Sequence, residues 1–212
     1  MITKMVNMVV VADNHQIKTA AKIVKNGGLI IYPTETVYGL GCDPYNLEAV
    51  KKVFKVKGRT NKPLPILVSN LKKAMEISHF TDEALKLAKK FWPGPLTIVL
   101  KRKNSAPSFL GGNPKLIGVR VPNHPVALKL VKLCGGFLVG TSANLSGKKP
   151  PTTAYEVAKQ IGSKVDLILD GGKTSIGLSS TVLDLSTKKP KILREGPITK
   201  KEISSLLGKQ VL

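Results

Sequence analysis

Residues 32–41, YPTETVYGLG, gather two threonine hydroxyls, a carboxylate and two glycines directly after a short apolar run. Glycine lets a ligand approach the backbone closely, and a hydroxyl such as that of Thr36 can hold a polar group. A plain turn would have much the same composition. Taken alone, this segment therefore leaves ligand binding and an ordinary turn equally open.

A group of basic residues closes the helix predicted over residues 47–57. Lys57, Arg59 and Lys62 follow one another within a short stretch, and Gly58 separates the first two. Cations at the end of a helix complement its dipole, which is the simplest explanation for them. They also suit a triphosphate, although the sequence contains no Walker A spacing.

Arg120 stands in an apolar run, residues 116–121, that predicts a strand. A buried arginine is costly unless an anion compensates its charge. A structural ion pair or a substrate carboxylate would each provide that compensation, and both interpretations remain open.

The segment GTSANLSG, residues 140–147, follows a predicted strand over residues 137–140. Strand ends are the usual ligand sites of open α/β sheets. Ser142 and Asn144 suit contacts with phosphate or ribose, and the alternative is again a polar turn. No His or Asp pattern accompanies Ser142, which argues against a serine nucleophile.

The chain carries 34 basic and 13 acidic residues, a net charge of +21. Such a field attracts polyanions, although a lysine-rich surface can also reflect genome composition or a hot habitat. Only four of the basic residues are arginine, whose rigid fork suits phosphate and carboxylate. Three of the four, Arg59, Arg120 and Arg194, fall in candidate segments; Arg194 lies in LREGP (193–197), which forms a weaker signal with LSSTV (178–182).

Alternating helices and strands must position these side chains. Helical periodicity predicts helices over residues 14–26, 47–57, 81–91 and 126–133. Capping boxes at Thr153 and Thr199 begin two more. Apolar runs predict strands over residues 29–32, 65–68, 96–100, 116–121, 137–140, 167–169, 181–185 and 191–194. The alternation predicts an α/β fold with a twisted, open mixed sheet flanked by helices.

Composition narrows the class of protein further. Two cysteines are too few for a disulfide scaffold or a zinc cluster, and three scattered histidines lack metal-ligand spacing, so no metal site is predicted. We find no signal peptide and no apolar run near the roughly 18 residues of a membrane span. We expect a cytoplasmic protein with one domain over residues 1–212, a core over 14–197 and a C-terminal helix over 199–207.

Seven segments in order, between Gly27 and Pro197, resemble the YrdC-like family of threonylcarbamoyl-AMP synthases. They are YPTETVYGLG, KGR with KPL after it, FWPGPLTIVL, IGVRVPNHP, GTSANLSG, SSTV and LREG. The resemblance implies an open α/β sheet with a positively charged concave cleft. It also implies a nucleotidyltransferase that combines L-threonine, bicarbonate and ATP into threonylcarbamoyl-adenylate and pyrophosphate. Partner proteins would use the adenylate to make threonylcarbamoyladenosine beside the anticodon of certain tRNAs.

The resemblance also suggests a role for individual residues. Lys57 and Arg59 complete a KxR signature and are the catalytic candidates. The threonine-binding candidates are Thr36, Arg120 and Ser180. The ATP-binding candidates are Arg59, Lys62, Ser142, Asn144 and Arg194. Mg²⁺ would accompany the nucleotide, held mainly by phosphate and water.

The chain departs from the family pattern near Lys62. Three residues separate Arg59 from Pro63, where relatives often have four, and Leu67 stands where some relatives have a histidine that contacts threonine. Some relatives carry an additional C-terminal domain, which is not expected in 212 residues.

Two other functions fit parts of the sequence. A module that binds double-stranded RNA or tRNA would use the positive charge, with a steep salt dependence and little sensitivity to Thr36→Ala. A carbamoyl-adenylate domain of hydrogenase maturation proteins would share the fold, but it usually sits in a much longer chain with zinc fingers.

Overall fold

The computed structural model describes residues 9–59 and 61–212. The first eight residues of the predicted domain, and Thr60, lie outside the described part. The α/β class with mixed strand directions is confirmed, but the hydrogen-bonded strands form two sheets where the sequence predicted one. The first sheet has five strands in the order β1 (Val9–Val11), β10 (Leu167–Asp170), β2 (Ile30–Tyr32), β3 (Gly39–Gly41) and β9 (Thr141–Ser142).

The second sheet has seven strands. Six run in the order β12 (Lys191–Arg194), β11 (Thr181–Asp184), β6 (Leu96–Arg102), β7 (Leu116–Arg120), β4 (Ile66–Val68) and β8 (Phe137–Val139). The seventh, β5 (Ser78–His79), pairs with β6. Strand β6 lies between β11, to which it is parallel, and β7, to which it is antiparallel, and β12 pairs with the other edge of β11. The candidate segments on β7, β11 and β12 therefore belong to neighbouring strands of one sheet.

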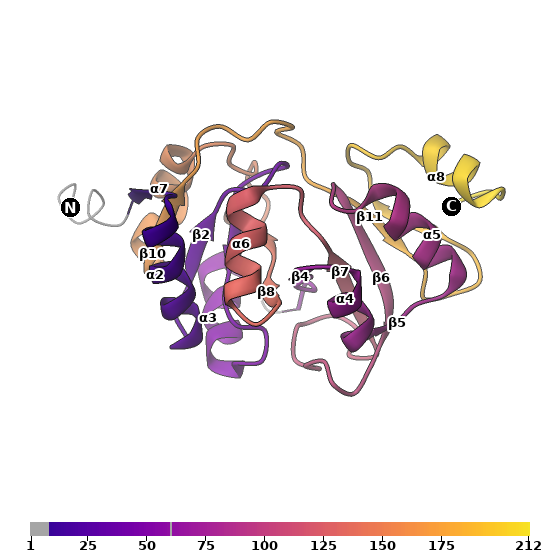
Figure 1. Cartoon of the computed structure of the whole chain (residues 1–212), viewed down its shortest axis with the longest axis horizontal. Helices are drawn as coiled ribbons and strands as arrows, with labels where there is room; N and C mark the ends of the chain where they lie inside the picture. The colour runs from indigo at the N-terminus through magenta and orange to yellow at the C-terminus, as the bar shows by residue number, and fades with distance from the viewer. Residues whose placement is uncertain (1–8, 60) are drawn as a thin grey trace.

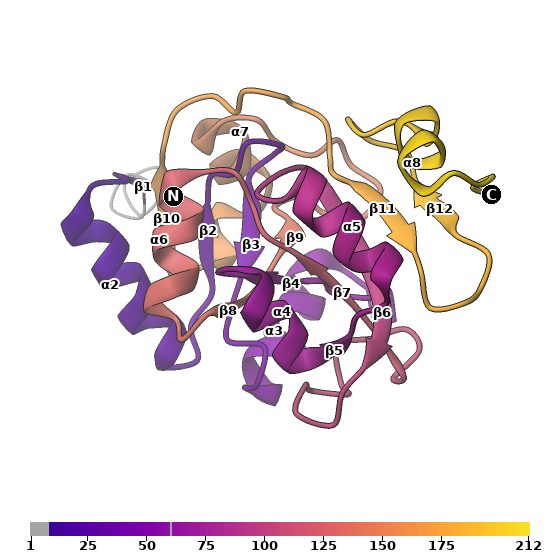
Figure 2. The ribbon, with the colours of Figure 1, turned by 45° about the vertical axis from the view of Figure 1, so that its right-hand side comes forward.

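The predicted helices are present, and a further helix over residues 71–77, only seven residues long, was not predicted. They are α2 (Asn14–Lys25), α3 (Leu47–Lys57), α4 (Leu71–Ile77), α5 (Asp82–Phe91), α6 (Pro125–Leu133), α7 (Ala154–Ile161) and α8 (Lys200–Leu207), with a short 3₁₀ turn at Gly162–Lys164. Helices α2 and α6 lie side by side over one half of the molecule, and α5 and α8 lie together on the other (Figures 1 and 2). None of the described helices has the length and apolarity to cross a membrane.

Two helix starts test the predicted capping boxes. At Thr199 the box is complete, because its side chain accepts from the Glu202 N–H while the Glu202 carboxylate accepts from the Thr199 N–H. At Thr153 only half forms: its hydroxyl accepts from the Glu156 N–H, but the Glu156 carboxylate bonds to the backbone of Thr152 instead. Both helices nevertheless begin at the predicted residue.

Strands β3 and β9 were not predicted, because their glycines and hydroxyls look like turns. They become strands by pairing, Gly39 with Ser142 and Leu40 with Thr141. Strand β3 also runs antiparallel to β2 under the ring of Tyr32. A Cβ atom added at Gly39 would stand 2.8 Å from that ring, so a larger residue would force the strands apart.

The chain passes from one sheet to the other at Gly140. Strand β8, just before it, pairs with β4 of the seven-stranded sheet, and β9, just after it, pairs with β3 of the five-stranded sheet. A Cβ atom at Gly140 would lie 2.5 Å from Cγ of Leu67, so only glycine fits this crossing. The segment GTSANLSG therefore sits at the junction of the two sheets.

Candidate active site

A cavity of about 690 Å³ is lined by residues of both sheets. All nine candidate site residues border it: Thr36, Lys57, Arg59, Lys62, Arg120, Ser142, Asn144, Ser180 and Arg194. The fold thus brings together segments that are widely separated in the sequence. Among the lining residues the structure describes, Asp184 carries the only carboxylate. Six lining residues are basic: Lys57, Arg59, Lys62, Arg120, Lys148 and Arg194.

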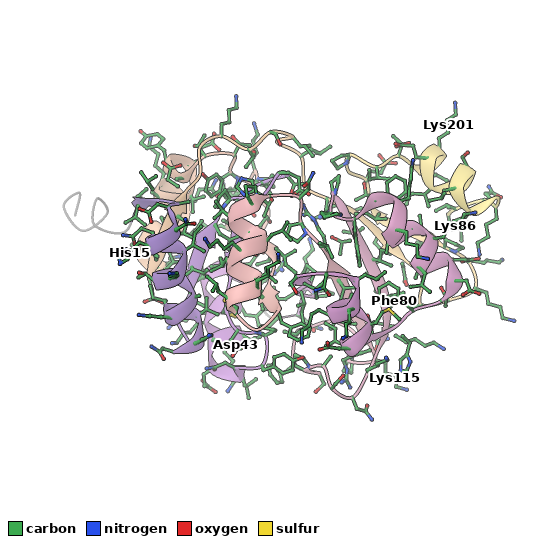
Figure 3. The ribbon with its side chains drawn as sticks, in the orientation of Figure 1. His15, Asp43, Phe80, Lys86, Lys115 and Lys201 are labelled. Carbon is green, nitrogen blue, oxygen red and sulfur yellow. The ribbon has the colours of Figure 1, made fainter. Side chains whose placement is uncertain are left out.

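Much of the remaining lysine charge lies on the outside. Lys86, Lys115 and Lys201 are exposed and project from the surface (Figure 3). The net charge of the chain is therefore a poor guide to the cavity, and the few arginines are a better one.

We call Thr36, Arg120, Ser180 and Arg194 the Arg120 side of the cavity. Arg120 ends β7 and is 5% exposed. Its Nε donates to the Gly94 carbonyl at 3.0 Å and its Nη1 donates to the Thr36 hydroxyl at 3.1 Å. Two directions of the guanidinium are therefore fixed by protein atoms.

The charge of Arg120 is compensated by Glu35. Nη2 of Arg120 lies 2.7 Å from Oε1 of Glu35, and both side chains are only 7% exposed. The contact lacks hydrogen-bond alignment, so neither Glu35 oxygen has a donor and Nη2 has no acceptor. Of the two interpretations open for Arg120, the ion pair is present, yet Arg120 also borders the cavity.

Ser180 links three strands of the seven-stranded sheet. Its hydroxyl lies 2.8 Å from that of Thr97 on β6, and Nη2 of Arg194 on β12 donates to it at 3.0 Å. Nε and Nη2 of Arg194 also donate to the Ser180 carbonyl. Burial, and then the charge of Arg120, lowers the pKa of Arg194. Arg194, predicted with the ATP contacts, thus lies beside the predicted threonine contacts.

We call Lys57, Arg59, Lys62, Ser142 and Asn144 the Arg59 side. Helix α3 ends at Gly58, whose φ of 62° is the left-handed conformation that glycine adopts at little cost. The next N–H, that of Arg59, returns to the Phe54 carbonyl at 3.2 Å. This turn brings the Arg59 side chain to the cavity.

Lys57 is buried in the protein, with 2% exposure. Its ammonium group donates to the carbonyls of Ser142 at 2.5 Å and Asn144 at 2.9 Å. Burial, followed by the charges of Arg59 and Lys62, lowers its pKa to about 7. Lys57 therefore ties the end of α3 to the junction of the two sheets.

The other groups on the Arg59 side are engaged to different degrees. Nη2 of Arg59 makes one long contact of 3.4 Å to the Thr141 hydroxyl. The amide of Asn144 donates to the carbonyls of Leu145 and Lys148. Among the described residues, Nε of Arg59 and Oδ1 of Asn144 have no partner, but both atoms are buried. A ligand would therefore reach this side through the terminal N–H groups of Arg59 and through Lys62, which is exposed at the rim.

A sequence profile for the Sua5_yciO_yrdC family, described as "Telomere recombination", matches residues 22–196. The chain belongs to this family. Relatives named threonylcarbamoyl-AMP synthase include those of Pyrococcus abyssi, 40% identical over 198 residues, and Bacillus subtilis, 40% identical over 200 residues. Each alignment covers 92% of this chain but 58% of the relative, so the chain spans little more than half of their length.

Solved structures of Sua5/YciO/YrdC proteins are also similar. P. abyssi Sua5 in complex with L-threonine has a TM-score of 0.90 at 39% identity, covering 96% of this chain and 61% of that one. Escherichia coli YciO has a TM-score of 0.84 at 29% identity, covering 92% of this chain and 98% of that one. The family thus includes chains of this size as well as longer ones.

Some cavity residues of this Sua5/YciO/YrdC domain escaped prediction. Thr97 and Thr141 lie inside motifs that were recognised, but nothing local to the sequence singles them out. Lys148 follows GTSANLSG directly and was passed over as one lysine among many. Leu67, at the position of the family histidine, borders the cavity and packs against Gly140.

Proposed function

We propose that this chain is an L-threonylcarbamoyladenylate synthase, which makes threonylcarbamoyl-AMP and pyrophosphate from L-threonine, bicarbonate and ATP. The observation that carries the proposal is the convergence of nine candidate residues on one cavity in a member of this family. We further propose one YrdC-like domain that acts in the cytoplasm and supplies the adenylate to tRNA-modifying partners.

The Arg120 side suits an amino acid carboxylate. Arg120 borders the cavity, its Nη1 keeps one N–H beyond the one donated to Thr36, and Arg–carboxylate hydrogen bonds are among the strong ones. Hydroxyls of Thr36 and Ser180 adjoin the guanidinium groups and can bind the rest of a small polar substrate.

The Arg59 side suits the triphosphate and the ribose. Arg59 and Lys62 border the cavity and supply positive charge. Arg194 sits beside Ser180 on the opposite side, where it can contact the nucleotide close to the amino acid. The two substrates would therefore meet between Arg59 and Arg194.

The chemistry needs alignment and charge neutralisation more than a protein nucleophile. The threonine amine would attack the carbon of bicarbonate, forming a carbamate as water leaves. A carbamate oxygen would then attack the α-phosphorus of ATP as the bond to the β-phosphate breaks and pyrophosphate departs. Fixed arginines and lysines stabilise the charge that develops on the phosphate oxygens, and holding both substrates in line lowers the entropic barrier.

A magnesium ion would accompany the nucleotide and neutralise phosphate charge. Within residues 9–59 and 61–212, no group of three or more His, Cys, Asp or Glu side chains could hold a metal. Phosphate oxygens and water would supply most of its ligands, as is usual for Mg²⁺. Asp184 is the carboxylate on the cavity lining.

Release of pyrophosphate from ATP tests the proposal. We expect release only when L-threonine and bicarbonate are both present, and Thr36→Ala should reduce it because Thr36 contacts Arg120 inside the cavity. Lys201→Ala removes an exposed charge and is the control that should keep full activity. Release that ignores threonine would refute the proposal, and steeply salt-dependent RNA binding unaffected by Thr36→Ala would favour an RNA-binding module instead.

A further inference from the structure

Glu35 lies in the turn between β2 and β3, and the protein holds this turn from several directions. The Glu35 carbonyl accepts from the Ile176 N–H at 2.9 Å and from the Ser175 hydroxyl at 3.2 Å. The Thr34 hydroxyl accepts from the N–H groups of Thr36 and Val37. The backbone that carries the Glu35 carboxylate is therefore fixed.

The carboxylate of Glu35 is placed behind Arg120 relative to the cavity. Arg120 and Thr36 border the cavity, whereas Glu35 is not among the lining residues and is 6% exposed. It cannot meet a substrate that fills the cavity without first displacing its neighbours. Its carboxylate contacts Arg120 and also acts on the pKa of His124, and the contact with Arg120 is its direct route to a ligand in the cavity.

The Arg120–Glu35 pair differs from the other salt bridges of the described chain. Those three join side chains that are 34–72% exposed, where ion pairs contribute little. Here both partners are buried. Removal of the carboxylate would leave a buried arginine unpaired and would strongly destabilise the folded protein. The pair makes it possible to keep a charged arginine at the wall of the cavity.

The geometry of the pair leaves Arg120 free to bind a ligand. The 2.7 Å approach of Nη2 to Glu35 compensates the charge of Arg120, and this nitrogen is buried. Nε donates to Gly94, and Nη1 uses one of its two N–H bonds for Thr36. Because Arg120 borders the cavity, an incoming carboxylate can accept the second N–H of Nη1 while the ionic contact with Glu35 persists.

We infer that Glu35 is a positioning residue that holds the charged guanidinium of Arg120 in place to receive the carboxylate of the amino acid substrate. This inference rests on the proposed function, which it deepens by adding a residue that does not touch the substrate. It predicts that loss of the Glu35 charge selectively weakens the handling of threonine, whereas the nucleotide on the Arg59 side is unaffected.

The test is a steady-state analysis of Glu35→Gln, which keeps the shape of the side chain and removes its charge. We expect the KM for threonine to rise about 10- to 100-fold, by analogy with the loss of a partner that orients a ligand-binding group. The KM for ATP should stay within about twofold, because Arg59 bonds to Thr141 and Arg194 keeps its bonds to Ser180 when Glu35 loses its charge. A purely structural role would instead lower kcat through a smaller active fraction and leave both KM values unchanged.

Two further variants keep the test decisive. Glu35→Asp retains the charge on a shorter side chain and should fold and restore much of the threonine KM. In an Arg120→Ala background Glu35→Gln should have no additional effect, because residues that act through one contact are not additive. Glu48→Gln, which breaks an exposed pair with Lys51, is the matched control and should change nothing.

The possible outcomes separate this inference from the proposed function. If the wild-type protein neither binds threonine in calorimetry nor releases pyrophosphate with it, the proposed function fails and the inference falls with it. If the wild-type protein is active but Glu35→Gln leaves the threonine KM unchanged, or raises both KM values equally, the function stands and the positioning role is refuted. Additive effects of Glu35→Gln and Arg120→Ala would also refute it.

Discussion

The two sides of the cavity differ in how far their polar groups are already engaged. On the Arg120 side, the guanidinium groups of Arg120 and Arg194 are held by Glu35, Thr36 and Ser180. On the Arg59 side, Arg59 makes one long hydrogen bond to Thr141. Arg120 and Arg194 are preorganised by protein contacts, whereas Arg59 keeps terminal N–H groups for a ligand.

This difference suits two ligands of different size. A small amino acid makes few contacts, so its site must hold its donors in position before binding to limit the entropic cost. A triphosphate brings many charged oxygens and can organise the cations of Arg59 and Lys62 around itself. Lys57 and Asn144 are exceptions on the Arg59 side, because the ammonium group of one and the amide N–H groups of the other are committed to the protein.

The largest effect is expected from Arg59→Ala, because no other group described on that side offers a guanidinium. Pyrophosphate release should fall about 100- to 1000-fold, the usual cost of removing a donor that stabilises charge in the transition state. Assays at saturating threonine, beside Lys201→Ala, measure the loss. A drop of less than about fivefold corresponds to less than about 1.36 kcal/mol of activation free energy. Such a small loss would mean that the Arg59 side does not stabilise the reacting phosphates.

Lys57→Met tests whether burial disfavours the charged form of Lys57 in the folded protein. Burial lowers the pKa of Lys57 to about 7, whereas an unfolded lysine keeps a value near 10.4. Between these values the unfolded chain binds more protons, so Lys57 makes stability rise with pH.

Urea unfolding at pH 7 and at pH 10 measures this contribution. The free energy of unfolding of the wild type relative to Lys57→Met should increase over the interval by about 3 kcal/mol. The same comparison with Lys86→Met, at an exposed lysine, should show no change. An unchanged difference for Lys57→Met would mean that Lys57 titrates normally.

Ser180→Ala and Asn144→Ala sharpen the contrast between the two sides. Ser180→Ala should raise the KM for threonine about tenfold with little change for ATP, since a hydrogen bond to a charged group is worth about 1.5–3 kcal/mol. Asn144→Ala should do the reverse. Separate titrations of threonine and ATP measure both constants, and equal effects of the two variants on both substrates would contradict the division of the cavity.

The smallest effect is expected at His124, which reports on Glu35 without any substrate. Burial lowers the pKa of His124, and the negative charge of Glu35 partly opposes this by raising it. Glu35→Gln should therefore lower the pKa of His124 further, as measured by NMR titration with His124→Gln assigning the signal. An unchanged pKa would mean that Glu35 carries no charge in the folded protein.

The sequence predicted those parts of the molecule whose signals are local. Helix α3 was predicted with its observed bounds, because its apolar periodicity and the glycine after it lie within one segment. All nine candidate site residues could be named from the sequence because each lies in a short contiguous motif, and all nine border one cavity. Their roles stay predictions.

The remainder depends on contacts between distant segments. Arg120 and Thr36 are 84 positions apart, and no local pattern pairs them or assigns Glu35 to Arg120. Strands β3 and β9 were missed for the same reason, since they become strands by pairing, β3 with both β2 and β9. Arg194 was grouped with ATP by its motif and placed beside Ser180 by the pairing of β11 and β12.

Mass spectrometry of the product formed with ¹³C-bicarbonate tests the central claim most directly. Incubation with L-threonine, ATP and Mg²⁺ should yield threonylcarbamoyl-adenylate with ¹³C in its carbamoyl carbon, and omission of any one substrate should abolish it. Formation of an unlabelled threonyl adenylate, of ADP and phosphate, or of no nucleotide product would contradict the claim that this cavity joins all three substrates.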